Sequence, residues 1–275
     1  MTDKQRYFIE LAYDGTKYHG WQIQQNAVSV QELLNKALAT ILRQPIETIG
    51  CGRTDTGVHA REFFAHFDLE VNNPLAMDDS QQAEESKSTD HGLSTIDYGL
   101  KVRGLNSLLP PDIAIKNIIQ VHEDAHARFD ATRRSYQYHI HFHKDPFLHG
   151  YSWMVRDVPN IMLMNQAAAI IMEYTDFSCF SKSNTQVKTN NCKITRAEWI
   201  KTDQGIVFHI SADRFLRNMV RAIVGTLMMV GKHEIESEAV RAIIESKNRS
   251  NAGTSVPACG LYLTEVKYPF LVSSS

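Results

Sequence analysis

The chain of 275 residues has no long apolar run, few cysteines and little net charge, and each of these absences argues against a class of protein. No stretch approaches the ~20 apolar residues of a membrane-spanning helix. The first fifteen residues, MTDKQRYFIELAYDG, lack the apolar run of about 7 to 15 residues that a signal peptide needs. We therefore expect a cytoplasmic protein that makes no use of a membrane.

The four cysteines are scattered, with no C-x-x-C pair, so the sequence contains neither a zinc ribbon nor a redox motif. Reduced thiols in the cytoplasm are the simplest interpretation. The 43% of hydrophobic residues is ordinary for a soluble protein and provides for a substantial core. The cysteines are Cys51, Cys179, Cys192 and Cys259.

The formal charge of −2 does not by itself favour an acidic partner such as nucleic acid. The segment 72–98, however, contains six acidic residues and one lysine, so the rest of the chain is mildly basic, with a formal charge of +3. That balance is compatible with RNA but does not identify it. The segment has few apolar residues, and we interpret it as a solvated loop or a partly disordered insertion.

Hydrophobic periodicity predicts the order β-α-β-β-α-β for the first half of the chain. Ser29 is placed to cap a helix, with Glu32 at its third position, and Pro110-Pro111 ends a second helix. The predicted strands cover 7–14, 46–50, 63–71 and 113–121.

The second half repeats this order without a residue-level repeat. Strands are predicted over 135–142, 194–201, 206–212 and 261–266, and helices over 159–174, 215–230 and 236–246. Two such units predict an α+β fold with two ferredoxin-like halves, 1–122 and 123–275. Each half would have a mixed, mostly antiparallel sheet with helices on one face, and a cleft would lie between the halves.

The string CGRTDTGVHA, Cys51 to Ala60, contains the Asp-Thr-Gly triplet of aspartic proteases at Asp55. A protease needs two carboxylates about 3 Å apart that share a proton, and the chain has no second such triplet. Arg53 is a permanently charged neighbour that favours an ionised carboxylate. Asp55 alone could simply cap a turn, but Arg53, His59 and two glycines around it, between two predicted strands, favour a functional loop.

Several motifs together resemble, in order and spacing, those of the tRNA pseudouridine synthase A family. The resemblance covers nearly the whole chain except the acidic segment. The family's more usual motif GRTDAGVHA has alanine where this chain has Thr56. The motifs are CGRTDTGVHA, HARFDATRRSYQY (126–138), DFSCFSK (176–182), FLRNMVRAIVG (215–225), GLYL (260–263) and the N-terminal LAYDGTKYHGWQIQQNAVSVQE.

This resemblance implies isomerisation of uridine to pseudouridine in the anticodon stem-loop of tRNA, at positions 38 to 40. Members of the family use no metal or organic cofactor and commonly form homodimers of two ferredoxin-like halves. A uridine stacked in RNA must be flipped out to reach a side chain in a cleft.

The resemblance also implies residue roles. Asp55 would be the nucleophile, attacking either C1′ of the ribose or C6 of the base, and Arg221 would pair with it and orient it. Tyr136 would stack on the flipped uracil, and Leu261 would lie below the base. Without the family match, Tyr136 and Leu261 would be interpreted as core residues and Arg221 as a surface helix charge.

Contacts to the RNA backbone would offset the cost of flipping the base. The predicted substrate contacts, beside Tyr136 and Leu261, are Arg53, His59, Arg128 and Arg217, with Arg61, Arg133, Arg134 and Arg214 as further basic residues near the motifs. The alternative to an enzyme is a non-catalytic RNA-binding module on the same scaffold, which would have no need of Asp55, Tyr136 and Arg221 together.

Overall fold

The computed structural model describes residues 4–70, 99–181 and 189–271. The acidic segment 72–98 lies outside the described residues. The helices that the structure describes include none that is long and apolar enough to cross a membrane.

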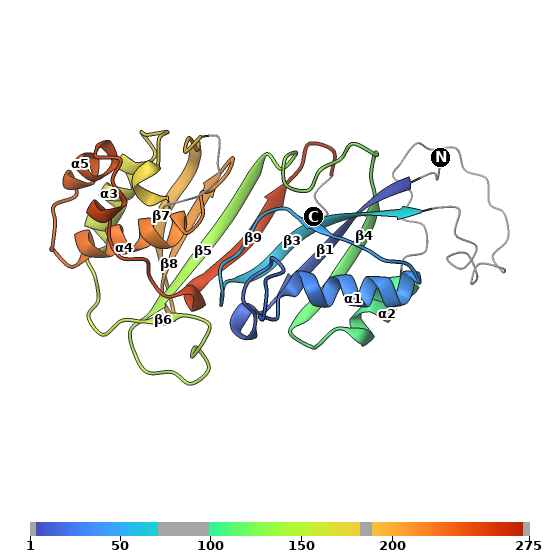
Figure 1. The fold of residues 1–275 in the computed structure, drawn as a ribbon. Helices are drawn as coiled ribbons and strands as arrows, with labels where there is room; N and C mark the ends of the chain where they lie inside the picture. Colours follow the sequence, from blue (N-terminus) through green and yellow to red (C-terminus); the bar gives the residue numbers. More distant parts are fainter. Residues whose placement is uncertain (1–3, 71–98, 182–188, 272–275) are drawn as a thin grey trace.

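The strands of the described residues form one nine-stranded sheet (Figure 1). Its main path runs β4-β1-β3-β9-β5-β8-β7, while β2 pairs with β3 and β6 with β5. All pairs are antiparallel except β3–β9 and β5–β6. The strands are β1 (Lys4–Tyr13), β2 (Ile49–Gly50), β3 (His59–Glu70), β4 (Ile113–Gln120), β5 (Arg133–His141), β6 (Trp153–Met154), β7 (Ile194–Thr202), β8 (Gly205–Ala212) and β9 (Leu261–Lys267).

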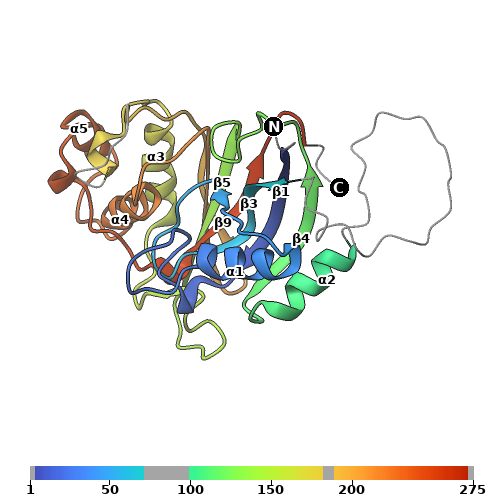
Figure 2. The same cartoon turned by 45° about the vertical axis from the view of Figure 1, so that its right-hand side comes forward.

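The helices form two groups that lie at opposite ends of this sheet (Figures 1 and 2). The first group packs with β1, β3 and β4 around one hydrophobic core, and the second packs with β5, β7 and β8 around another. Burial of these two cores is the main source of stability. The first group is α1 (Val30–Leu42) and α2 (Gly99–Leu108); the second is α3 (Ile161–Ile171), α4 (Met219–Gly231) and α5 (Ala239–Glu245).

The mixed fold with a mostly antiparallel sheet is confirmed, but the two sheets expected from the sequence are one continuous sheet. Each half has the same relative order, β4-β1-β3-β2 in the first and β9-β5-β8-β7 in the second. The halves join where β3 runs parallel to β9, with His59 opposite Tyr262 and Ala60 opposite Leu263. The edge strand of one half thus extends the sheet of the other, which satisfies backbone groups that would otherwise be exposed.

Helix α1 begins where its sequence signals predict. The hydroxyl of Ser29 accepts a hydrogen bond from Glu32 N at 3.3 Å. The carboxylate of Glu32 then pairs with Lys36 at 2.6 Å, one turn further along the helix. Helix α3 begins at Ile161, two residues later than predicted, because Asn160 caps it and accepts from Met162 N and Leu163 N.

The helix predicted over 215–230 begins at Met219, which corrects the prediction by one turn. Asn218 adopts a left-handed conformation with φ of 67°, which interrupts the helical hydrogen-bond pattern that precedes it. Phe215 and Arg217 therefore lie in the connection before α4 rather than on its surface. Strand β3 likewise begins at His59, four residues before the predicted start at Phe63, because it pairs with β9 there.

Acid should destabilise the fold partly through His66, which is 3% exposed and whose Nδ1 accepts from Ala127 N at 3.1 Å. Burial lowers the pKa of His66 to about 4, below the value of about 6.5 in an unfolded chain. Neutral His66 therefore contributes stability that is present above pH 6.5 and is lost as the pH falls toward 4.

We expect His66→Asn to lose less thermal stability than the wild type between pH 7 and pH 5, measured as the shift in Tm. The exposed His19 offers a control, and His19→Asn should keep the wild-type shift. Equal shifts for all three proteins would contradict this role of His66.

Candidate active site

Asp55 lies in a loop, 51–58, whose backbone is held by hydrogen bonds before and after this residue. Cys51 N donates to Phe64 O at 2.7 Å, and Gly57 N donates to Tyr18 O at 3.3 Å. The hydroxyl of Thr54 accepts from Trp21 N at 3.1 Å and lies 2.9 Å from the hydroxyl of Tyr13. Contacts on both sides of Asp55 thus hold the loop in one conformation before any substrate binds.

The loop also packs closely on the segment that follows β1. A Cβ atom on Gly20 would lie 2.1 Å from Thr54 O, and one on Gly15 would lie 2.0 Å from Val58 O. Only glycine allows this approach of two backbones, and Gly20 in addition has a φ of +85°.

The Asp55 carboxylate, 25% exposed, lies between two arginines. Arg221 Nη1 donates to Asp55 Oδ2 at 3.3 Å, and Arg217 Nε lies 3.7 Å from Asp55 Oδ1. Two cations on one carboxylate hold its orientation. This environment is the opposite of a protease dyad, in which one proton must be retained between two carboxylates.

Helix α4 and the segment before β9 together position Arg221. Its Nε donates to Val256 O at 2.7 Å, and Val256 N donates back to Arg221 O at 3.3 Å. The guanidinium is only 20% exposed, so Arg221 is not the surface charge that its helical position alone would suggest. Arg217, 57% exposed, reaches the same carboxylate from the connection before α4.

Tyr136 on β5 is partly buried and packs against both hydrophobic cores, which places it at the boundary between the halves. Its ring meets that of Phe215 edge-on, with centroids 5.1 Å apart and planes at 87°. Burial raises the pKa of Tyr136, and the nearby charge of Asp55 adds to this rise. The side chain is therefore a neutral phenol at neutral pH. Leu261, 6% exposed, begins β9 and pairs with Tyr138 on β5.

Three arginines with exposed or partly exposed side chains gather near the Asp55 loop, and we call them the arginine cluster: Arg53, Arg128 and Arg214. Partial burial lowers the pKa of Arg128, and the positive charges of Arg53, Arg134 and Arg214 lower it further. Mutual repulsion among these cations would be relieved by an anion bound between them. The guanidinium of Arg128 also lies 5.8 Å from the ring of Phe129, which is 74% exposed.

His59, predicted as a substrate contact, is buried in the structure. The ring is 2% exposed, stacks on Tyr262 with centroids 4.6 Å apart, and its Nε2 lies 3.2 Å from Gly150 O. Nδ1 accepts from Gly15 N at 3.1 Å in the neutral tautomer that carries its proton on Nε2, and it also lies 3.0 Å from Asp14 Oδ1. Burial lowers the pKa of His59, so the neutral ring that accepts from Gly15 prevails at neutral pH.

The other basic residues near the motifs also have structural contacts. Arg133 pairs with Glu265 at 2.9 Å, and Arg61 lies 5.2 Å from the ring centroid of Tyr262. Arg134 is 8% exposed and donates to backbone carbonyl oxygens. Proximity to a motif in the sequence therefore did not distinguish exposed arginines from arginines with structural contacts.

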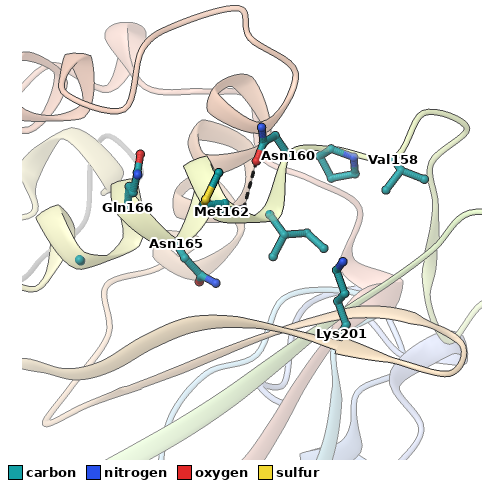
Figure 3. Close-up of a pocket in the computed structure, with 9 residues that line it drawn as sticks. Val158, Asn160, Met162, Asn165, Gln166 and Lys201 are labelled. Atoms are coloured by element: carbon teal, nitrogen blue, oxygen red, sulfur yellow. Dashed lines mark hydrogen bonds between the residues drawn. The ribbon is translucent and has the colours of Figure 1, made fainter.

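An open pocket of about 870 Å³ lies elsewhere, beside the start of α3 and Lys201 on β7 (Figure 3). It includes the exposed side chains of Val158 and Met162 and none of the predicted site residues. Within residues 4–70, 99–181 and 189–271, no group of three or more His, Cys, Asp or Glu side chains is placed to hold a metal ion.

A family model described as tRNA pseudouridine synthase matches residues 174–269. The chain is also 51% identical over 266 residues to the tRNA pseudouridine synthase A of Bacteroides fragilis, covering 96% of this chain and 97% of the relative. The corresponding protein of Bacteroides thetaiotaomicron is 50% identical, with coverage of 96% and 91%, and that of Porphyromonas gingivalis is 48% identical, with coverage of 96% and 97%.

The chain belongs to the tRNA pseudouridine synthase A family. The resemblance drawn from the motifs is confirmed over almost the whole length, and the chain is an isomerase of this family.

The structure adds residues that motif reasoning missed. Thr54, next to Asp55 in the family motif, pins the loop, whereas the variable neighbour Thr56 is exposed. Phe215 supports Tyr136, and Gly20 makes room for Thr54 O. Thr54 and Phe215 lie inside the quoted motifs, but only tertiary contacts distinguish their roles from those of their neighbours.

Gly20→Ala should displace the Asp55 loop. Both the positive φ and the clash with Thr54 O oppose a side chain, so we expect a loss of about 1–3 kcal/mol in the free energy of unfolding, measured by urea denaturation. Pseudouridine synthase activity should fall as well.

Gly52→Ala, in the same loop, is the control, since an added Cβ there has no atom within 4 Å. It should stay within about 0.5 kcal/mol of the wild type. If the two variants were equally stable, the close approach at Gly20 would not constrain the loop.

Proposed function

We propose that this chain isomerises uridine to pseudouridine in the anticodon stem-loop of tRNA, at positions 38 to 40, with Asp55 as nucleophile. The observation that carries this proposal is the Asp55 carboxylate, partly exposed on a pinned loop between Arg221 and Arg217. The family's name gives tRNA as the substrate and pseudouridine as the product.

The reaction breaks the bond from ribose C1′ to uracil N1 and forms a bond from C1′ to C5, and the proton that C5 loses is balanced by the proton that N1 gains. An ionised carboxylate can attack C1′ or C6 of the base, and either route leaves a covalent intermediate from which the base is rejoined through C5. The two arginines fix the direction in which the carboxylate attacks. Tyr136, a neutral phenol beside Phe215, provides an aromatic face on which the uracil can stack.

A base paired or stacked in the anticodon arm must leave its stack to reach Asp55, at a cost of a few kcal/mol. The arginine cluster supports this step, since its three like charges are placed to bind backbone phosphates beside the nucleophile loop. Exposed Phe129, held beside Arg128, offers a further stacking surface for an unpaired base.

We also propose that residues 1–122 and 123–275 act as two ferredoxin-like halves and that the enzyme works in the cytoplasm as a homodimer without metal or organic cofactor. The equal strand order of the two halves supports the first part. In this arrangement the first half supplies Asp55 and the second supplies Tyr136, Arg217 and Arg221.

Asp55→Asn should abolish pseudouridine formation on unmodified tRNA, with a rate at least about 10³-fold lower, because the amide has the same shape but is not a nucleophile. Binding of tRNA should be retained. Mapping of pseudouridines after incubation measures both the rate and the position.

Asp203→Asn, in the exposed β7–β8 turn, is the matched control and should be fully active. Robust product from Asp55→Asn would refute the nucleophile, and product outside the anticodon arm would refute the substrate position. Binding without product by the wild-type protein would instead support a non-catalytic RNA-binding module.

The two arginines at Asp55 should differ in importance. Arg221→Met should lower the single-turnover rate by about 100-fold or more, because the less exposed guanidinium orients the carboxylate through contacts to both Asp55 and Val256. Arg217→Met should cost about tenfold or less, since its side chain is more exposed and its contact longer. A larger loss for Arg217→Met than for Arg221→Met would reverse this ranking.

A further inference from the structure

Arg134 on β5 is a buried arginine whose hydrogen bonds all go to the backbone. Nε and Nη2 donate to Cys51 O at 3.2 and 2.7 Å, Nη2 also donates to Arg128 O at 2.7 Å, and Nη1 donates to Asp213 O at 3.0 Å and Ala131 O at 3.4 Å. These five bonds use all five N–H groups of the guanidinium.

The four carbonyl oxygens belong to three segments that carry the proposed site. Cys51 begins the loop that holds Arg53 and Asp55. Arg128 and Ala131 flank the turn that presents Phe129, and Asp213 precedes the connection that holds Arg214 and Arg217. One side chain thus links a loop of the first half to two segments of the second half.

A buried guanidinium that donates only to carbonyl oxygens requires a partner for each of its N–H groups. Among the described residues no carboxylate forms an ion pair with Arg134, so the charge is compensated by carbonyl dipoles alone. Such an arrangement is favourable only while every donor is matched, because an unmatched charge or carbonyl would be left buried. The three segments therefore have one mutual arrangement that satisfies Arg134.

Neighbouring contacts show that the linked segments are otherwise well anchored. Cys51 N is bound to Phe64 O, and the Asp213 carboxylate accepts from Lys193 N and Arg214 N, each at 2.7 Å. Arg134 in addition fixes the position of the three segments relative to one another. That position sets how the Asp55 loop lies relative to the segments that carry Arg128, Arg214 and Arg217.

We propose that Arg134 is a positioning residue for the reaction: it holds the Asp55 loop in register with the segments that carry Arg128 and Arg217, without touching the substrate. The inference rests on the proposed function, since the rate it affects is that of pseudouridine formation. Arg133, its neighbour on β5, is 48% exposed and pairs with Glu265, so it provides a matched control.

Arg134→Lys keeps the charge but replaces a planar fork of five donors by one ammonium, which cannot bond to four oxygens in three segments. We expect its single-turnover rate on an unmodified tRNA transcript to fall by about 10- to 100-fold at saturating enzyme. The Kd for the same tRNA should change by less than about threefold, because the exposed phosphate contacts remain. Arg133→Lys should stay within about twofold of the wild type in both measurements.

Hydrogen exchange provides a readout that does not depend on activity. In Arg134→Lys the amides of 51–58, 126–132 and 213–218 should exchange faster than in the wild type, while those of α1 and α4 keep their protection. In Arg133→Lys no region should change. Arg134→Ala should regain part of its rate with added methylguanidinium but not with methylammonium at equal ionic strength.

A wild-type rate for Arg134→Lys, or unchanged exchange in all three segments, would overturn the proposal. A rate that fell only in proportion to the unfolded fraction, measured by circular dichroism, would also overturn it, since Arg134 would then serve stability alone. If the wild-type protein formed no pseudouridine, the proposed function would fail, whereas the exchange measurement would still decide whether Arg134 holds the three segments together.

Discussion

The site depends on the short parallel pairing of β3 with β9. Only His59–Tyr262 and Ala60–Leu263 are paired there, yet this contact joins two parts of the sheet that each have their own core and helices. The Asp55 loop leads directly into β3, and β9 continues from the segment that holds Arg221 through Val256. The same junction therefore brings a carboxylate of the first half against cations of the second.

Near this junction the polar side chains are of two kinds: buried ones that form hydrogen bonds to the backbone, and partly exposed ones that solvent can reach. His59 and Arg134 are almost fully buried, and Thr54 bonds to Trp21 N, so their hydrogen bonds maintain the conformation of nearby loops. Asp55 and the arginine cluster keep access to solvent. Buried polar groups have few alternative partners. Their hydrogen bonds therefore fix the backbone that carries the exposed side chains.

Sequence signals between neighbouring residues predicted most helices and strands well. They failed where contacts between distant residues determine the start of an element or its pairing. Ser29 and the alternating strands gave correct predictions because capping and side-chain alternation are properties of neighbouring residues. The start of α4 was placed one turn too early because the left-handed Asn218, whose amide donates to Ser255, depends on a segment 37 residues away. The continuous sheet was not predicted for the same reason, since nothing in the sequence of β3 indicates that it pairs with β9.

The motifs by themselves determined the family, because their combination of residue types is specific even without coordinates, and they predicted Asp55, Tyr136 and Arg221 as site residues. The distinction among the arginines, by contrast, was decided by tertiary structure alone. Arg53, Arg133 and Arg134 have the same charge and lie in motifs, but their exposure ranges from solvent-facing to 8%. A guanidinium can donate to a phosphate or to a carbonyl oxygen, and only the surrounding backbone determines which of these it meets.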